Sequence, residues 1–571
     1  MSMREPSRAI KLCGTEQGDA VGQTLRAGPL TAEFDNGNLR YLRYQGVEVL
    51  RALAYLVRDE NWGTYTPKLE DLKIEQRSDS FKIAYTGVCA RADQQVAYDA
   101  NIEGRSDGSI DFRATGRPLT DFVTARTGFV VLHPLKGVAD HVLEVEHVDG
   151  HVVKDKFPAL VNPDCPFRDV RALKHEVLPG VWATCRMEGE AFEMEDHRNW
   201  TDASFKTYVR PLSKPWPYTL TKGDAFEQSV KLSFSGTPRS NSAAAASNSI
   251  EVKLGPATKQ KMPPLGLGMP AEEVDSTLTQ IELLKPVAPK FLQCWFDPRQ
   301  KHGVSLLHKY RQICDAVGAT AVLEIVVQSI DDFGNELDRV AEYAEMARLK
   351  VVGIAVCPVG DLKSVLPGGK RPPAPPLEEL YVAARDSFPG IKLGGGMFSF
   401  FTELNRKRPP AQLLDFVTNT TCPIVHAADD RSVMETLEAL AYQIETARSF
   451  IGSTPHRVGP SSIGCRENPH GATYAPNLNN ERVCLAKVEP RQRGIFAAAW
   501  TLGYIATLAQ AGVSQICMAA PTGPLGLIYA RGDNAQPWFD TLDGPAVYPV
   551  YHVLAGLTKG SGASILQNQN S

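Results

Sequence analysis

The sequence predicts a multidomain α/β protein: an N-terminal β-sandwich (supersandwich-like), then a (β/α)₈ TIM barrel and a short C-terminal appendage. Three observations lead to this prediction. The first part of the chain alternates polar and apolar residues, a linker-like segment follows, and strand and helix patterns then take turns. A chain of 571 residues is also too long for one hydrophobic core.

The β-sandwich prediction comes from short runs of period two within residues 28–235. Phe81–Tyr85 and Gly108–Ala114 are examples, and turn formers such as Asn36-Gly37 separate them. An Asn-Gly pair suits a tight hairpin because glycine adopts positive φ at little cost. Few long helical periods interrupt this part of the chain, which favours a sandwich.

The domain boundaries follow from a change of composition at residues 236–249. This stretch combines Gly, Ser, Thr and Pro with a run of alanines, which predicts a linker, although alanines also suit a helical turn. We therefore expect a tail at residues 1–27, the β-sandwich at 28–235, the linker at 236–249, the barrel at 250–545 and a C-terminal segment at 546–571.

The barrel prediction rests on eight short apolar runs with helical periods between most of them. Val433, Leu437, Leu440 and Ile444, for example, share one helix face. A doubly wound open sheet is the alternative, but no GxGxxG follows the first run. The expected strands are residues 265–269, 291–296, 321–327, 351–356, 391–397, 423–427, 457–461 and 514–518.

Composition and charge exclude several classes of protein. Apolar residues make up 43% and charged residues 22% of the chain, which is typical of a globular protein. The formal net charge is −4 without a Lys/Arg-rich face, so no nucleic-acid partner is expected. No stretch approaches the roughly 20 apolar residues that cross a bilayer, so no membrane partner is expected either. The sequence leaves open whether the chain forms a homo-oligomer.

The cysteines indicate a reducing compartment. Their number, 11, is odd, they are spread from Cys13 to Cys517, and none forms a CxxC pair. Disulfides are rare in the cytosol, and residues 1–11 show no apolar signal core. We therefore expect free thiols and a cytoplasmic location.

Catalytic side chains are expected at the C-terminal ends of the barrel strands, where the loops of such barrels converge. The candidates are Glu403, His426, Asp429 and Glu324. Each also has a structural interpretation. An Arg or Lys could hold Glu324 inside its apolar run, and Glu403 could be a helix-start acid. Asp429 or Asp430 is expected to cap a helix, and His426 equally suits a structural role.

Substrate-binding groups are expected from a dense polar motif in the β-sandwich and from the barrel mouth. A polyhydroxylated ligand needs many hydrogen-bond partners and can stack on Trp200; a solvated hairpin is the alternative. Amides of the glycine run or of Asn405 are candidates to face an oxyanion. The predicted binding residues are Glu195, Asp196, Arg198, Asn199, Trp200, Asp202, Lys206, Gly395, Gly396, Asn405 and Asp297.

No metal and no cofactor are predicted. Neither HxH nor HExxH occurs, so the usual spacing of zinc ligands is missing from the sequence. A serine nucleophile is not expected either, because there is no GxSxG motif and Ser461-Ser462 lacks that context.

Two long motifs resemble the bacterial D-apionate lactonase family: Met194–Tyr208, and Gly394–Phe398 leading into Phe401–Arg406. The likeness extends over most of the chain, from the Phe34–Arg40 turn to Tyr551–Val553. The resemblance implies an enzyme that opens D-apionolactone, a branched sugar lactone, to D-apionate in apiose catabolism. It also implies an N-terminal β domain, a central barrel and a C-terminal β piece, which we expect to be short here.

Lactone hydrolysis needs a base that activates water, a place for the oxyanion and a proton for the leaving alkoxide. Glu403 or His426 is the expected base, and the other residue or Asp429 completes proton transfer. One alternative is a barrel glycoside hydrolase in which Glu324 and Glu403 form the carboxylate pair. A second alternative is a non-catalytic carbohydrate-binding protein that uses Trp200 as its platform.

Overall fold

The structure is a computed structural model that describes residues 5–19, 21–237 and 253–568. The chain divides into two compact units. The β unit comprises Ala20–His197 and Ala203–Ile250, and the barrel unit comprises Met1–Asp19, Arg198–Asp202 and Glu251–Ser571. Most of the linker predicted at 236–249 lies outside the described residues, because the description stops at residue 237.

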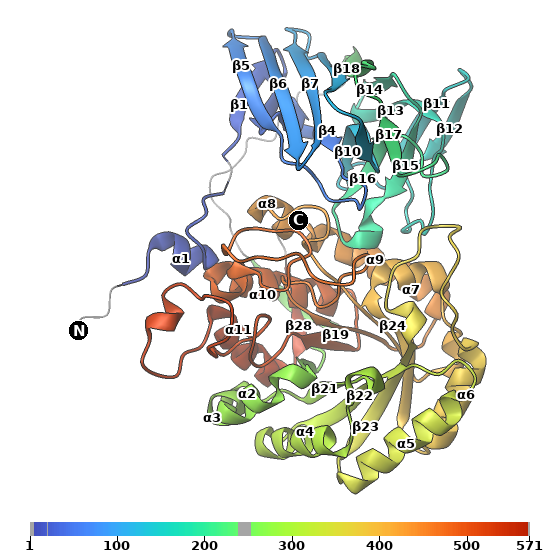
Figure 1. Cartoon of the computed structure of the whole chain (residues 1–571), viewed down its shortest axis with the longest axis vertical. Helices are drawn as coiled ribbons and strands as arrows, with labels where there is room; N and C mark the ends of the chain where they lie inside the picture. Colours follow the sequence, from blue (N-terminus) through green and yellow to red (C-terminus); the bar gives the residue numbers. More distant parts are fainter. Residues whose placement is uncertain (1–4, 20, 238–252, 569–571) are drawn as a thin grey trace. The chain divides into compact units, whose positions relative to one another are not determined.

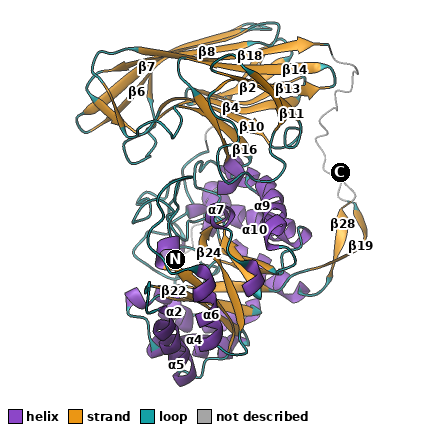
Figure 2. Ribbon diagram, turned by 90° about the vertical axis from the view of Figure 1, so that its right-hand side faces the viewer, coloured by secondary structure: helices purple, strands orange, loops and turns teal. Residues whose placement is uncertain are grey.

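The β unit is built on a 16-stranded antiparallel sheet that folds over itself (Figure 2). Ring contacts join strands far apart in the sheet order: Phe112 and Phe129 lie 4.8 Å apart, and Tyr55 and Tyr98 lie 4.4 Å apart. These aromatic pairs fill the space between the layers, which confirms the sandwich. The sheet order is β1-β2-β3-β4-β10-β16-β15-β13-β14-β18-β8-β7-β6-β5, with β11 and β12 attached at β13.

The strands of the β unit are β1 Gln23–Ala27, β2 Leu30–Asp35, β3 Asn38–Tyr44, β4 Val47–Val57, β5 Lys68–Gln76, β6 Phe81–Arg91, β7 Gln94–Gly104, β8 Ile110–Pro118, β9 Phe122–Thr124, β10 Thr127–Pro134, β11 Val142–His147, β12 Val152–Lys156, β13 Val170–Leu178, β14 Val181–Glu188, β15 Phe192–Asp196, β16 Ser204–Val209, β17 Tyr218–Leu220 and β18 Phe226–Gly236. Along β14 buried and partly exposed residues alternate, as expected for a strand with one face in the core.

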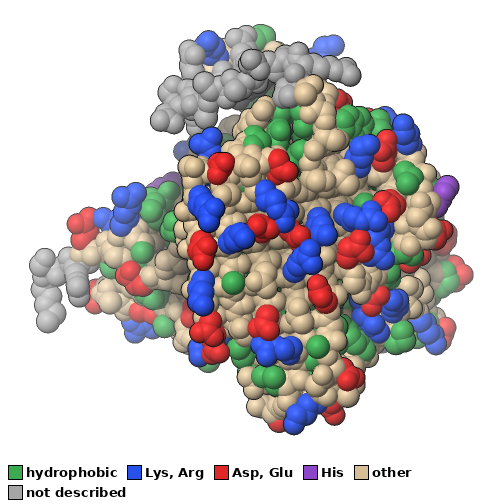
Figure 3. All heavy atoms as spheres, turned by 90° about the horizontal axis from the view of Figure 1, so that it is seen from above, with side chains coloured by type: hydrophobic (Ala, Val, Ile, Leu, Met, Phe, Trp, Pro, Cys, Tyr) green, Lys and Arg blue, Asp and Glu red, His purple; other side chains and the backbone are tan. Residues whose placement is uncertain are grey.

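Figure 3 shows Lys and Arg side chains interspersed with Asp and Glu on one face of the molecule.

The barrel unit contains a closed barrel of eight parallel strands, which confirms the (β/α)₈ prediction (Figure 1). The strands are β20 Leu265–Met269, β21 Phe291–Phe296, β22 Thr320–Val327, β23 Val351–Pro358, β24 Lys392–Phe400, β25 Phe416–Thr420, β26 His456–Ser461 and β27 Gln515–Met518. The surrounding helices are α2 Val274–Thr279, α3 Ile281–Leu284, α4 Val304–Val317, α5 Phe333–Met346, α6 Leu377–Ser387, α7 Phe401–Lys407, α8 Asp430–Glu435, α9 Leu437–Ile451 and α10 Ile495–Gln510.

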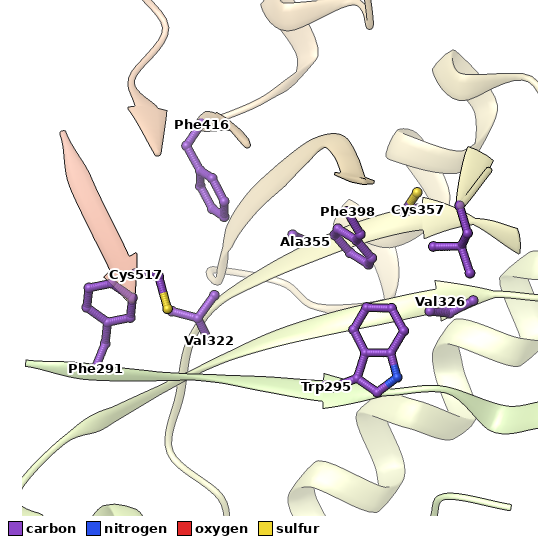
Figure 4. Close-up of a cluster of buried hydrophobic side chains, with 10 residues drawn as sticks. Phe291, Trp295, Val322, Val326, Ala355, Cys357, Phe398, Phe416 and Cys517 are labelled. Carbon is purple, nitrogen blue, oxygen red and sulfur yellow. The ribbon is translucent and has the colours of Figure 1, made fainter. Parts of the chain in front are cut away.

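Apolar side chains from five neighbouring barrel strands and from β27 form one buried cluster (Figure 4). Trp295 on β21 meets Phe398 on β24 with ring centroids 5.6 Å apart. Bulky side chains of this kind fill the interior of such barrels, so the barrel is a packed core and not a pore. The buried members of the cluster are Phe291, Trp295, Val322, Val326, Ala355, Cys357, Leu362, Phe398, Phe416 and Cys517.

The sixth strand was predicted wrongly at residues 423–427. It is β25, Phe416–Thr420, and residues 423–427 belong to the loop that follows it. Three of the five residues of β25 are polar, which hides the strand from a search for apolar runs, but two of these side chains form hydrogen bonds to neighbouring strands of the barrel wall. Thr420 Oγ1 donates to the carbonyl of Ser399 at 2.8 Å, and Asn419 Oδ1 lies 2.7 Å from His456 Nε2. Satisfied polar groups can therefore be buried in a strand.

Both ends of the chain form secondary structure that packs on or pairs with other parts of the protein. Within residues 1–27, the helix α1 Arg8–Cys13 contacts α10 in the barrel unit, whereas β1 belongs to the sheet of the β unit. After the barrel come the helix α11 Pro549–Leu557 and the strand β28 Ser564–Asn568. β28 pairs antiparallel with β19, Leu254–Lys261, which precedes the barrel. Among the residues that the structure describes, no helix is long and apolar enough to cross a membrane.

Two histidines in the core of the β unit have no hydrogen-bond partner among the described residues. His133 on β10 and His175 on β13 are buried, their rings lie 5.4 Å apart, and Phe157 packs against both. Burial lowers the pKa of His133 well below its usual value and lowers that of His175 to about 4. Both rings are therefore neutral in the folded protein at neutral pH.

This histidine pair is expected to destabilise the protein in mild acid. Histidine in an unfolded chain titrates near 6.5, so between pH 6.5 and 4 the unfolded state binds more protons than the folded state. Stability then falls as the pH falls, by up to about 3 kcal/mol from His175 alone. Thermal unfolding of H175F should lose less stability between pH 6.5 and 4.5 than the wild type does. H151F, at an exposed histidine, should keep the wild-type slope, and an unchanged slope in H175F would contradict the assignment.

Candidate active site

A short piece of the polar motif predicted for the β-sandwich belongs to the barrel unit. Arg198–Asp202 groups with the barrel, and two barrel helices hold it. From α7, Thr402 Oγ1 donates to the carbonyl of Asn199 at 2.7 Å, and Asn405 Nδ2 donates to Asn199 Oδ1 at 3.0 Å. From α9, Gln443 Nε2 donates to the carbonyl of Arg198 at 2.7 Å. The segment therefore brings its side chains to the loops at the C-terminal ends of the barrel strands.

The attached segment forms a carboxylate–histidine pair with the barrel. His426 Nδ1 lies 2.7 Å from Asp202 Oδ2, and the two side chains are 19% and 16% exposed. His426 stands on the loop after β25, so it is placed by a loop and not by a strand end. A carboxylate that accepts the Nδ1 proton selects the tautomer in which Nε2 is the basic nitrogen. This is the arrangement that a histidine base requires.

Trp200 packs against the side chains around this pair instead of presenting an open face. It is 4% exposed, and its ring lies edge-on to His426 at 5.8 Å and 5.0 Å from the ring of His470. The guanidinium carbon of Arg406 lies 5.6 Å from its centre. The structure thus differs from the stacking platform expected for a sugar, because other side chains already occupy the surroundings of the indole ring.

Glu403 lies in the first turn of α7 and accepts several hydrogen bonds. Its carboxylate is buried and receives Ser364 Oγ at 2.8 Å, the amide of Val365 at 3.1 Å and Arg371 Nη1 at 3.2 Å. Arg406 approaches at 3.5 Å. These partners tie the segment after β23 to α7, so the position of Glu403 fits an anchor for that loop better than a base facing substrate.

Glu324 on β22 is fully buried and held by an arginine, the structural interpretation considered above. Its carboxylate accepts Gln293 Nε2 at 2.7 Å and pairs with Arg466, which comes from the loop after β26. Burial alone would lower the pKa of the Arg466 guanidinium, but the neighbouring Glu324 raises it overall. Glu324 therefore fixes Arg466 in the barrel interior.

Other predicted residues also have structural partners. Asp429 caps α8 by accepting the amide of Ser432 at 3.0 Å. Asp297 is buried, caps the turn after β21 and pairs with Arg299 at 2.7 Å. The amide of Asn405 is used in holding Asn199, as described above.

The glycine run is explained by packing in the barrel wall. A Cβ on Gly395 would lie 2.4 Å from the hydroxyl of Tyr381, and one on Gly396 would lie 2.2 Å from the carbonyl oxygen of Thr418. Gly396 has φ +122°, which side chains rarely adopt. The glycines let β24 lie close to its neighbours, and this accounts for them without a bound oxyanion.

The remaining residues of the polar motif lie in the β unit. Glu195 on β15 pairs with Lys206 on β16 at 3.1 Å, and Asp196 accepts the amide of Asn162 at 2.9 Å. Burial lowers the pKa of Lys206, and Glu195 partly offsets this. The motif that looks continuous in sequence is thus divided between the two units.

The sequence analysis assigned no role to the charged groups of the loop between β26 and α10. Arg466 and Glu467 follow β26 directly, and Lys487 comes late in the same loop and pairs with Glu272 at 2.8 Å. Lys363, after β23, donates to the carbonyl of Asn468 at 2.7 Å. No periodic pattern marks such loop residues. An Arg-Glu pair just beyond a predicted strand end was the single available signal.

Comparison with known proteins identifies the family. Residues 10–237 match the model described as D-apionate lactonase, N-terminal domain, and residues 265–562 match D-apionate lactonase, TIM barrel domain. A curated protein from Brucella anthropi named D-apionate lactonase is 41% identical over 538 residues, which cover 93% of this chain and 88% of that protein.

Two of the similar solved structures are distant in sequence. Galactose 1-epimerase from Lactobacillus acidophilus NCFM is 9% identical, with a TM-score of 0.28 over 40% of this chain and 98% of its own. A mutant xylanase from Cellvibrio japonicus is 12% identical, with a TM-score of 0.33 over 52% and 98%. We draw no conclusion from these two. The family models and the curated relative agree over most of the sequence, and the chain belongs to the D-apionate lactonase family.

Proposed function

We propose that this chain is a sugar-lactone hydrolase that converts D-apionolactone to D-apionate, with His426 as the general base and Asp202 as its orienting partner. The observation that carries the proposal is the Asp202–His426 pair within the barrel unit, at 2.7 Å. Membership of the D-apionate lactonase family and the name of the 41% identical relative support the substrate. A role in apiose catabolism follows from that substrate.

The reaction begins when His426 Nε2 takes a proton from water as the water oxygen attacks the lactone carbonyl. Asp202 accepts the Nδ1 proton, stabilises the imidazolium that forms and keeps the ring in place. A positioned base of this kind contributes typically about 10²–10⁴ in rate. The attack places negative charge on the carbonyl oxygen, and collapse of the tetrahedral intermediate breaks the bond to the ring oxygen.

Cationic side chains near the same loops favour that negative charge. Arg299, Lys363, Arg466 and Lys487 all lie close enough to Glu467 to act on its carboxyl electrostatically. Fixed positive charges near a developing oxyanion stabilise the transition state more than the ground state. In this proposal they replace the glycine amides that the sequence suggested.

The geometry does not favour a glycoside hydrolase. That alternative needed Glu324 and Glu403 as a pair, but Glu324 bonds to Gln293 and Arg466, whereas Glu403 bonds to Ser364, Val365 and Arg371. Each carboxylate has its own structural partners, so neither is arranged as acid or nucleophile for a glycosidic bond.

We also propose a cytoplasmic location and a small sugar lactone as the main partner. All 11 cysteines are free, including pairs of neighbouring thiols such as Cys422 and Cys465, which suits a reducing compartment. Whether the chain works as a homo-oligomer is tested by measuring its mass in solution.

The first experiment measures acid release from D-apionolactone with a pH indicator, beside other aldonolactones and aryl glycosides. Fast release from the apionolactone is expected, and it should persist with a chelator because a histidine base needs no metal. Release of an aryl alcohol from a glycoside, together with no acid release from any lactone, would reject the proposal. Loss on chelation with recovery on adding zinc would instead mean that Asp202 and His426 hold an ion.

Replacement of the proposed base should slow turnover strongly without unfolding the protein. H426Q should lower kcat about 10²–10⁴-fold on D-apionolactone, since it removes the proton acceptor. D202N should lower kcat by about 10²-fold or more, because its amide no longer favours the productive tautomer. H552Q, at an exposed histidine on α11, is the matched control and should retain wild-type kinetics. H426Q with near-normal kcat would exclude His426 as the base.

A positioning role for Glu403 makes a different prediction. E403Q weakens the ion pairs with Arg371 and Arg406 inside a buried site, so the unfolding free energy should fall by about 1–3 kcal/mol. Activity should fall with it, while the shape of the kcat/KM pH profile stays that of the wild type. E445Q, on the exposed side of α9, should change neither quantity. A changed pH profile with unchanged stability would make Glu403 the base.

A further inference from the structure

Glu467 differs from most of the carboxylates that lie at or after the ends of the barrel strands. Within the part of the chain that the structure describes, its side chain makes no hydrogen bond and no ion pair, although it is partly buried. Six other carboxylates at or after the strand ends are each paired with a cation: Glu272 with Lys487, Asp297 with Arg299, Glu324 with Arg466, Asp361 with Lys407, Glu403 with Arg371 and Asp430 with Arg482. Partly buried carboxyls without a partner are uncommon and occur preferentially at functional sites.

The backbone around Glu467 is fixed on both sides. Cys465 Sγ donates to the carbonyl of Glu467 at 2.7 Å, and Lys363 Nζ donates to the carbonyl of Asn468 at 2.7 Å. Just before it, Arg466 is anchored on the buried Glu324. Several interactions therefore fix the backbone that carries Glu467, while its side chain remains unpaired. This combination is typical of a preorganised catalytic group.

The charged and titratable groups that face Glu467 come from several elements. They are Arg299, Lys363, Arg466 and Lys487, together with Tyr474 and Cys465. Burial raises the pKa of the Glu467 carboxyl, and the four cations offset this only in part. The carboxyl thus retains its proton to higher pH than an exposed glutamate does.

Two buried thiols, Cys422 and Cys465, interact with groups of the dyad and of the Glu467 loop. The thiols of Cys422 and Cys465 interact directly; burial raises the pKa of Cys422, and Cys465 and Asp202 raise it further. Cys465 in turn bonds to the backbone of Glu467. Three residues after Glu467, His470 contacts Trp200, which contacts His426. A series of contacts thus links the dyad to the loop that carries the unpaired carboxyl.

We propose that Glu467 is a second catalytic residue of this site, the acid that gives its proton to the ring oxygen as the lactone opens. The proposal rests on the lactonase function proposed above. When the bond between the carbonyl carbon and the ring oxygen breaks, the electron pair goes to that oxygen and the Glu467 proton follows. His426 holds the proton from water, and its transfer through solvent to Glu467 resets both groups. The products are the hydroxyl and the carboxylic acid, whose ionisation releases the proton that the assay detects.

The test compares two lactones that differ in leaving group, using the full-length chain. D-apionolactone expels an alkoxide, which needs protonation, whereas dihydrocoumarin expels a phenolate, which needs little help. E467Q should lower kcat about 10²-fold or more on the first and less than about 10-fold on the second. H426Q should slow both. E342Q, at an exposed glutamate on α5, should behave like the wild type on both.

Two further readouts separate catalysis from structure. The alkaline limb of the kcat/KM profile should be present in the wild type and absent in E467Q, because activity is lost as pH rises through the raised pKa of Glu467. The thermal midpoint of E467Q should equal or exceed that of the wild type, since the exchange removes an unpaired, partly buried acid. If dihydrocoumarin is not turned over, the alkaline limb of the kcat/KM profile on D-apionolactone serves as the test of the role of Glu467.

Three kinetic results would overturn the role of Glu467: near-normal turnover of D-apionolactone by E467Q, an equal loss on both lactones, or an alkaline limb that survives the substitution. A fall in the thermal midpoint together with activity would assign Glu467 to the scaffold. Absence of acid release from every lactone by the wild type is a different result, because it rejects the proposed function itself and this role with it.

Discussion

The attachment of Arg198–Asp202 to the barrel unit is the interaction on which the candidate site depends. Residues on both sides of this segment belong to the β unit, yet the amides of Asn405 and Gln443 and the hydroxyl of Thr402 hold it among the barrel helices. All three donors are buried. A buried donor that loses its partner costs about 1–3 kcal/mol, so the attachment specifies one position for the segment. Asp202 reaches His426 only because that position is set.

Most buried charges of the barrel unit serve to hold loops. Glu324 fixes Arg466 and Glu403 ties α7 to the segment after β23. Removing one member of such a pair leaves the other buried and unpaired, which is more costly than losing an exposed salt bridge. The loops that carry Lys363, Glu467 and His470 are therefore rigidly placed by interactions that themselves do no chemistry. Catalytic groups on loops need such support, because a loop alone does not hold a side chain within the tolerance of a reaction.

Some expectations about individual residues agree with their contacts in the structure, and others differ from them. An arginine was considered as the partner of Glu324 and Arg466 is that partner, while a capping role was expected for Asp429 or Asp430 and Asp429 has it. The glycine run was read as a ligand loop, but its glycines are required by Tyr381 and by the neighbouring strand. Trp200 was expected to offer a face to sugar and is enclosed by side chains. These differences arise because the residue type determines only which interactions a side chain is able to make. The neighbouring residues in the folded protein determine which of these interactions it makes.

The sequence by itself determined the two architectures and seven of the eight barrel strands, because burial on one or both faces leaves a periodic pattern that can be read locally. It failed at β25, where buried Thr and Asn side chains bond within the wall and interrupt the apolar run. Which polar residues meet was decided by the tertiary structure alone. Asp202 and His426 are more than 200 positions apart, and Glu467 stands out only by comparison with six paired carboxylates at or after other barrel strands. Contacts between distant loops depend on the closure of the barrel, and no local pattern encodes them.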